Sequence, residues 1–209
     1  MAPIAILNGG SEDQKKIYLS DIASGKINFA VGFSEFIGAR EDCEIVYDNG
    51  KLNGRSIFVL DSNNASHIMV ADKSGKIFIT TMDSKGLTRN HLTTVDKTRS
   101  FSEVIFKDVE VELLEKSKDA ISPIQKSIDA GRVALAADTL GAAQEMINKA
   151  VEYSKERKQF GRVIGSFQAV KHMCAEMAAD LEPCYAMVWH AAHCLDEEEE
   201  ESRLSLIHI

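Results

Sequence analysis

The sequence predicts an α+β protein in which a domain of short antiparallel strands precedes two long helices. Two observations support this fold class. Residues 28–111 contain short segments rich in Val, Ile, Phe and Thr, separated by glycine-containing turns. Residues 122–195 instead carry apolar residues at three- and four-residue spacing, which is typical of amphipathic helices.

The first half should form a compact antiparallel barrel or sandwich, because its short segments are evenly spaced along the chain. The expected strands lie near residues 27–32, 44–47, 56–60, 67–71, 76–81, 92–95 and 102–109. Ahead of them, residues 11–25 begin with Ser and end with Gly, so they predict a capped helix.

The second half should contain helices over residues 122–155 and 166–195. Residues 122–125 read Ser-Pro-Ile-Gln, which is the pattern of a capping box with Pro at the first helical position. Gly161 and Gly165 bracket the break between the helices. We therefore expect an antiparallel helical pair that buries its apolar face.

Composition narrows the classes of function. The net charge of −8 and the lack of a basic stripe argue against a nucleic-acid surface. No apolar run approaches the roughly 20 residues that span a bilayer, and the first nine residues lack the basic flank of a signal peptide. We therefore expect a cytoplasmic protein.

The cysteines and histidines do not indicate a metal or disulfide site. The four cysteines contain no CxxC pair, so reduced thiols are expected. His190, His193 and Cys194 lie close in sequence, but no second ligand pair follows at a workable spacing. The acidic run at residues 196–201 is better interpreted as a solvated helix end. We expect no metal.

The segment between the two helices, residues 156–162, carries the strongest functional signal. It presents two arginines, a lysine and an amide around Gly161, and such a corner can hold an anion. From its chemistry alone, it also fits a solvated helix end whose cations face the helix dipole.

Residues 150–182 closely resemble the C-terminal helical domain of acyl-CoA dehydrogenases. The resemblance rests on Tyr at 153, Glu-Arg at 156–157, Gln-Phe-Gly at 159–161 and Phe-Gln at 167–168, all in the family's register. It implies an FAD-binding protein in which these residues reach the FAD of a neighbouring subunit. The cofactor contacts implied in this way are Arg157, Gln159, Phe160 and Gln168.

The β region resembles the middle domain of the same family. Phe33, Ser34 and Glu35 match its first flavin signature, although residues 36–41 lack the usual Ala-Gly-Ser-Asp loop. Residues 52–61 look like its second flavin strand, which implies flavin contacts from Phe58, Val59 and Leu60. Leu60 replaces the usual Thr or Ser, so only a backbone amide could reach the flavin there. An ordinary strand with a core Phe is the alternative for Phe58.

Two further segments follow the family's closing strands. They are Asp-Lys-Thr-Arg at residues 96–99 and the run at residues 104–111. Asp96 and Arg99 are more simply interpreted as a turn-stabilising pair.

The resemblance leaves the catalytic base unassigned. Abstraction of a proton next to a thioester needs a carboxylate, donors to the carbonyl oxygen and a hydride acceptor. Most of the family places the base far downstream of residue 209, and a minority place it where this chain has Gly131. Asp129 and Arg132 match a substrate-facing pair, although an i,i+3 ion pair within the helix explains them equally well.

The expected organisation follows from the resemblance. Residues 1–27 would end an N-terminal helical domain, residues 28–115 would form the middle β-domain, and residues 116–209 would begin an incomplete four-helix bundle. We expect a fragment that is inactive by itself.

The implied activity of the parent is FAD-dependent α,β-dehydrogenation of acyl-CoA in lipid metabolism. The parent would be a dimer or tetramer that passes electrons to an electron-transfer flavoprotein or a similar acceptor. Two alternatives remain: a non-catalytic subunit of a mixed oligomer, and a flavin oxidase or monooxygenase on the same fold.

Overall fold

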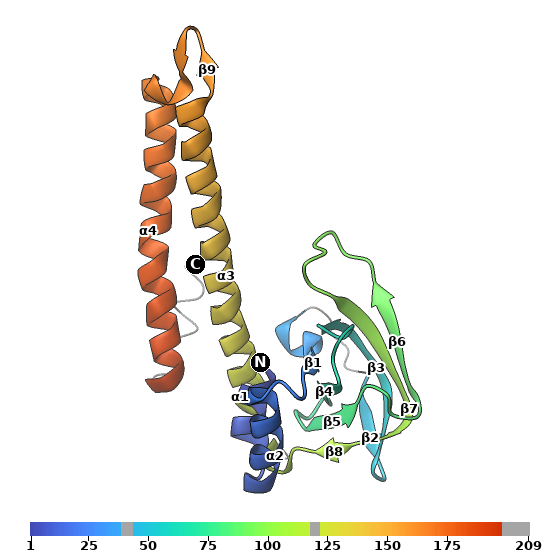
Figure 1. Ribbon diagram of the computed structural model, residues 1–209. Coiled ribbons are helices and arrows are strands. Elements are labelled where there is room, and N and C mark those ends of the chain that lie inside the picture. Colours follow the sequence, from blue (N-terminus) through green and yellow to red (C-terminus); the bar gives the residue numbers. More distant parts are fainter. Residues whose placement is uncertain (39–43, 118–121, 198–209) are drawn as a thin grey trace. The chain divides into compact units, whose positions relative to one another are not determined.

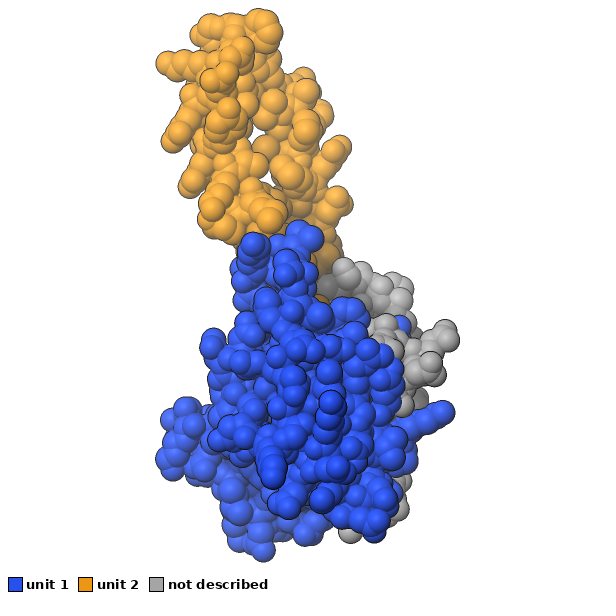
Figure 2. Space-filling model, turned by 90° about the vertical axis from the view of Figure 1, so that its right-hand side faces the viewer, with its two compact units in different colours: residues 1–128 blue, residues 129–209 orange. Residues whose placement is uncertain are grey.

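A computed structural model of the 209-residue chain describes residues 1–38, 44–117 and 122–197. Its contacts divide the chain into two compact units, residues 1–128 and 129–209, which Figure 2 colours separately.

The first unit contains two helices, eight strands and two short 3-10 turns within its described residues. In chain order they are α1 Ala2–Gly9, α2 Glu12–Ala23, β1 Phe29–Gly32, η1 Ser34–Ile37, β2 Val46–Asp48, β3 Lys51–Leu60, β4 His67–Ala71, β5 Ile77–Thr81, β6 Leu87–Leu92, β7 Phe101–Glu110, β8 Glu112–Leu113 and η2 Glu115–Ser117. The helix α3 Ser122–Glu156 begins in this unit and continues into the second.

The expected capped helix is confirmed as α2. The Ser11 hydroxyl accepts a hydrogen bond from the Gln14 amide N–H, and the Gln14 side chain accepts one from the Ser11 N–H, which completes a capping box. Gly25 follows the helix at φ +72°, where glycine is favoured. The Gln14 amide also donates to Glu112 at 2.6 Å, so the cap ties α2 to β8.

The strands form one sheet in the order β6-β7-β3-β1-β4-β5-β8, and β2 pairs with β3 (Figure 1). All pairs are antiparallel except β1 and β4, which run parallel from Phe29↔His67 to Gly32↔Val70. The parallel pair follows from the connection. After β3, which is antiparallel to β1, the chain passes to the other side of β1 and reverses its direction. The next strand, β4, therefore runs in the same direction as β1. The predicted antiparallel domain is thus confirmed in type, with this one exception.

One predicted strand was wrong. Residues 92–95 were expected to be extended, but β6 ends at Leu92. The partner strand β7 begins at Phe101, which pairs with Leu92, so no hydrogen-bonding partner remains for the following residues. The Val95 side chain is fully exposed.

The two faces of the sheet carry separate hydrophobic clusters, as the period-2 pattern of a strand requires. Along β4, Met69 lies in a cluster with Ile6 of α1 and Ile124 of α3. Its neighbours Ile68 and Val70 lie in the second cluster, on the other face. Each face of the sheet therefore carries its own layer of buried apolar side chains.

The second unit is an antiparallel helical pair, α3 and α4, as predicted (Figure 1). A short connection joins them and contains β9 Lys158–Gln159, β10 Arg162–Val163 and η3 Ile164–Ser166. The second helix, α4, spans Gln168–Glu197. The observed helix ends lie within two residues of the predicted ones. Val133 and Leu140 of α3 are buried, as are Val188 and Ala191 of α4. Within the described residues, no helix is both long and apolar enough to cross a membrane.

His67, at the start of β4, should make the first unit less stable in acid. Its ring lies 5.3 Å from the ring of Phe29 and 6.2 Å from that of Tyr18. Burial lowers the pKa of this imidazole below its usual value, while Asp83 opposes the shift. The unfolded chain therefore takes up the proton first as the pH falls through about 6.5.

We accordingly expect the free energy of unfolding of the first unit to fall as the pH drops from about 7 towards the lowered pKa of His67. His67→Gln should flatten this slope, because no imidazole remains to be protonated. Hydrogen exchange of the β1 and β4 amides at several pH values measures it. His91→Gln on the edge strand β6 is the control, and an unchanged slope in His67→Gln would contradict the prediction.

Candidate functional site

The end of β1 carries the first group of predicted cofactor residues. Phe33 is buried in the cluster beneath α1, and Ser34 begins the 3-10 turn η1. The Ser34 hydroxyl donates a 2.6 Å hydrogen bond to the carbonyl of Ile57. Its side chain thus fastens the end of β1 to β3, and Glu35 follows half-buried. Residues 39–41 of the following loop lie outside the described residues.

Phe58, Val59 and Leu60 occupy the facing end of β3. Phe58 has a φ of +56° and lies at a register shift in the β3–β7 ladder, so the strand bulges there. The bulge leaves the Phe58 side chain 45% exposed, which excludes the simple alternative of a core Phe. Val59 is fully buried in the hydrophobic cluster on the other face of the sheet. Leu60 pairs with Val31 of β1.

A hollow of about 490 Å³ lies beside this β1–β3 pair. Val31, Leu60 and Asp61 line it from the sheet, and Ile22 and Ile27 line it from the end of α2 and the link that follows. The hollow also reaches the first three residues of the chain. Its wall combines apolar side chains with the polar groups of Asn28 and Asp61, as small-molecule sites commonly do.

Asp129 and Arg132 form an ion pair one turn apart on α3. The Asp129 carboxylate lies 3.1 Å from the Arg132 guanidinium. Asp129 is only 3% exposed, whereas the Arg132 side chain is about half exposed. A buried carboxylate requires a partner, so the pair has a structural role within α3.

The connection between α3 and α4, residues 157–168, is hereafter called the tip. Phe160 and Gly161 have φ values of +54° and +78° and form a two-residue turn between the paired residues Gln159 and Arg162. Positive φ at both central positions defines a type I′ hairpin, which normally contains Asn or Gly. Phe160 is thus strained by roughly 1–2 kcal/mol, and it is 91% exposed.

The tip is strongly basic in a chain of net charge −8. Residues 155–172 contain five Lys or Arg and a single carboxylate, Glu156. Within the described part of the chain, Arg157 and Lys158 have no ion-pair partner, and the guanidinium of Arg162 lies over the ring of Phe167. Gln168 lies within 3.3 Å of His172. The tip therefore offers unpaired cations and amides to an anion.

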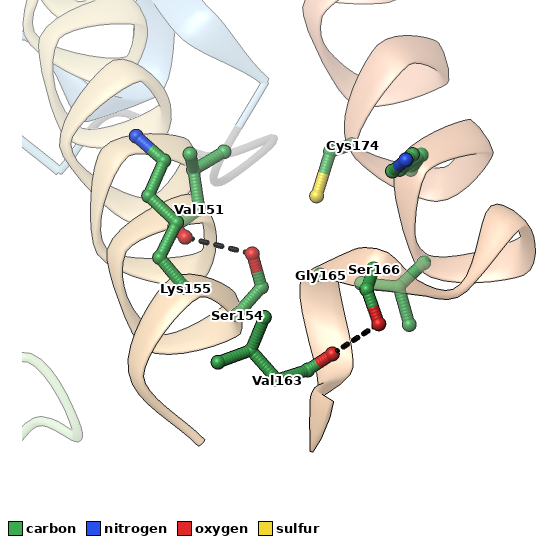
Figure 3. Close-up of a pocket in the computed structure, with 9 residues that line it drawn as sticks. Val151, Ser154, Lys155, Val163, Gly165, Ser166 and Cys174 are labelled. Atoms are coloured by element: carbon green, nitrogen blue, oxygen red, sulfur yellow. Dashed lines mark hydrogen bonds between the residues drawn. The ribbon is translucent and has the colours of Figure 1, made fainter. Parts of the chain in front are cut away.

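A second hollow of about 490 Å³ lies under the tip, between the facing ends of α3 and α4 (Figure 3). Figure 3 shows Ser154 of α3 and Cys174 of α4 directed into it, with Lys155 on the α3 side. The Ser154 hydroxyl donates to the Val151 carbonyl, so it is already satisfied within the helix. This hollow is apolar in its interior and basic at its edge.

The predicted residues of the second unit fall into two separate groups. From Asp129 to the last turn of α3 the helix rises about 40 Å, which exceeds the diameter of a small domain. The Asp129–Arg132 pair and the tip of one chain therefore do not meet in one site.

The comparisons with known proteins decide the family. Residues 121–207 match the model described as acyl-CoA dehydrogenase, C-terminal domain. A caffeyl-CoA reductase-Etf complex subunit, CarC, of Acetobacterium woodii is 30% identical over 95% of this chain and 57% of its own length. A short-chain specific acyl-CoA dehydrogenase of Clostridium acetobutylicum is 30% identical over 88% of this chain and 54% of its own length. This chain belongs to the acyl-CoA dehydrogenase family.

The solved structures agree with this assignment. Butyryl-CoA dehydrogenase from Megasphaera elsdenii superposes with a TM-score of 0.82 at 28% identity, over 92% of this chain and 55% of that one. This acyl-CoA dehydrogenase-family chain spans slightly more than half the length of the relatives it matches.

Some features of the acyl-CoA dehydrogenase-like sites were not predicted from the sequence. The strained backbone of Phe58 depends on a bulge that no residue pattern announces. The stacking of Arg162 on Phe167 depends on the register of the β9–β10 hairpin. The two residues are five positions apart, with Gly165 between them, and this spacing is compatible with the contact. Among the described residues, no group of three His, Cys, Asp or Glu side chains is arranged to hold a metal ion.

Gly165 should be essential for the shape of the tip. A Cβ atom there would lie 2.9 Å from the Ser154 carbonyl oxygen and 3.0 Å from its hydroxyl oxygen. Since a backbone carbonyl cannot rotate away, we expect Gly165→Ala to destabilise the helical pair by about 1–3 kcal/mol. Urea unfolding followed by helical circular dichroism measures the change.

Gly141→Ala is the matched control, because a Cβ at this position of α3 meets nothing within 4 Å. Alanine should there stabilise the helix by roughly 0.5–1 kcal/mol. Equal effects of the two substitutions would show that the tip does not depend on the close approach at Gly165.

Proposed function

We propose that this chain forms part of a flavin-dependent acyl-CoA dehydrogenase, which removes hydrogen from the α and β carbons of an acyl-CoA thioester. The observation that carries the proposal is the tip, where an exposed Phe160 and unpaired cations project from an acidic chain. The named activities of the relatives on CoA thioesters support it.

The residues present fit FAD in two separate places. The hollow beside Val31 and Leu60, with the exposed ring of Phe58 two residues away on β3, suits a flavin ring, which is flat and has both apolar and polar edges. The unpaired Arg157, with Gln159 and Phe160, suits the anionic and aromatic parts of a dinucleotide. A solved glutaryl-CoA dehydrogenase from Mycobacterium smegmatis, in complex with FADH2, shares this fold with a TM-score of 0.84 at 20% identity. We propose that the tip of one copy contacts the FAD of another.

Bound FAD would supply the hydride acceptor for the β carbon. The chain's own residues would orient the reactants. At Leu60 only the backbone amide can donate a hydrogen bond to the cofactor, because the side chain has no hydroxyl. Arg132, held by Asp129, would present its exposed guanidinium to the anionic part of the substrate. No catalytic base is assigned within residues 1–209.

The wider setting is also a proposal. We propose self-association as a dimer or tetramer, since the tip needs a second copy, and a cytoplasmic role in lipid metabolism. An electron-transfer flavoprotein is the proposed acceptor, because one relative is named as a subunit of an Etf complex. We further propose that residues 1–27, 28–115 and 116–209 correspond to three parts of the family's domain plan.

A non-catalytic subunit of a mixed oligomer is the second candidate. Two residues favour it. Leu60 lacks the hydroxyl expected beside the flavin, and Gly131 lacks the carboxylate found there in a minority of the family. Such a subunit would keep the tip, because its tip would complete the FAD site of an active partner.

Arg157→Ala should weaken FAD retention in the native protein. Loss of one hydrogen bond from a charged group costs about 1.5–3 kcal/mol, which is roughly a tenfold to 150-fold rise in the dissociation constant. Flavin fluorescence titration of the apoprotein measures it, with light scattering to verify that the oligomer persists.

Lys149→Ala is the control, because Lys149 is an exposed cation on α3 that pairs with Glu145 away from the tip. Its removal alters the net charge by the same amount. Flavin retention that is equal in both variants and the parent would refute the role of Arg157.

The two candidate functions differ in flavin reduction. A dehydrogenase should lose the visible absorbance of its oxidised flavin when an acyl-CoA thioester is added without oxygen. We expect this bleaching in the native protein with short-chain acyl-CoA, because two relatives act on short-chain substrates. Tightly bound flavin that no acyl-CoA of any chain length reduces would instead favour the non-catalytic subunit.

A further inference from the structure

Three side chains form a continuous stack across the tip. The guanidinium carbon of Arg162 lies 4.0 Å from the centroid of the Phe167 ring. The Phe167 ring in turn meets the Phe160 ring nearly perpendicularly, with 6.2 Å between centroids and 85° between planes. Arg162 therefore covers one face of Phe167, and Phe160 packs against that ring from another direction.

The position of Phe160 is energetically unfavourable for a phenylalanine. A large apolar ring at the first central position of a type I′ turn is strained, and it removes almost no surface from water. Asn or Gly would relieve the strain. Backbone strain of this kind, at an exposed aromatic residue, indicates that the ring itself is needed in this place.

Arg162 differs from the other cations of the tip. Its guanidinium lies over the Phe167 ring, whereas Arg157 has no side-chain partner among the described residues. Arg162 also stands directly across the hairpin from Gln159. A planar guanidinium stacks on an aromatic face far better than an ammonium does, so the stack depends on arginine and not only on a positive charge.

We infer that Arg162 is a positioning residue for the cofactor contact. Through Phe167 it fixes the orientation of Phe160, so that the exposed ring of one copy is already placed for a planar heteroaromatic group of the dinucleotide bound by another copy. The inference rests on the proposed function for the identity of the ligand. It adds a residue that does not itself touch the cofactor.

The test uses the native protein and four variants: Arg162→Lys, Arg162→Gln, Phe167→Leu and the double variant Arg162→Gln/Phe167→Leu. The first measurement needs no cofactor. The aromatic proton shifts of Phe160 in the apoprotein report its packing against Phe167, and they should change in every variant. The second measurement is the FAD dissociation constant at low and high salt.

If Arg162 acts through Phe167, each single variant should weaken FAD binding by roughly twofold to fivefold, and the double variant should be no weaker than the worse single variant. Lysine should not restore affinity. The salt dependence should stay as in the parent, because no direct contact with a phosphate is lost.

Additive losses, rescue by Arg162→Lys and a reduced salt dependence would overturn the inference, since they describe a direct charge contact. Unchanged Phe160 shifts in Arg162→Gln would also overturn it. Altered Phe160 shifts in a native protein that binds no FAD would uphold the positioning of Phe160, whereas the proposed function and the assigned ligand would fail. Circular dichroism verifies that α3 and α4 are intact in every variant.

Discussion

The uninterrupted length of α3 is the constraint on which the arrangement of the second unit depends. A helix of 35 residues holds the Asp129–Arg132 pair near one end and carries the tip at the other. Because the backbone hydrogen bonds of a helix fix its rise per residue, these two groups cannot approach each other by side-chain rotation. The hairpin at the end of α3 reverses the chain, and α4 then packs back along α3.

The β-sheet provides a different kind of constraint. Apolar clusters cover both of its faces, and one open part of the first unit is the edge where β1 and β3 end. There the Ser34 hydroxyl and the bulge at Phe58 set the local geometry. The Ser34 hydroxyl bonds β1 to β3 within the sheet, whereas the bulge directs the Phe58 ring towards solvent. The candidate site is thus a place where the regular ladder is interrupted.

Much of the fold could be predicted from the sequence, because hydrophobic periodicity reports burial directly. The helices over residues 122–156 and 168–197 and most strands were located in this way. The parallel β1–β4 pair could not be predicted, since it depends on which side of β1 the chain returns. Residues 92–95 were misassigned because strand propensity says nothing about where the partner strand β7 begins.

The candidate site could be predicted less completely. Residue types predicted the basic tip and the family resemblance predicted Phe58, but the commitment of the Ser34 hydroxyl to Ile57 and the burial of Val59 depend on three-dimensional packing. The same holds for the contact between Gly165 and Ser154, which is a matter of fractions of an ångström. Close approach between backbones leaves almost no trace in a single sequence.

The 40 Å that separates the tip from Asp129 has a consequence for how the cofactor would behave on dilution. If one copy completes the dinucleotide site of another, flavin occupancy and subunit association are linked equilibria. Flavin would then be released when copies separate, and added flavin would draw them together. The yellow colour of a purified sample would thus report protein concentration as well as cofactor content.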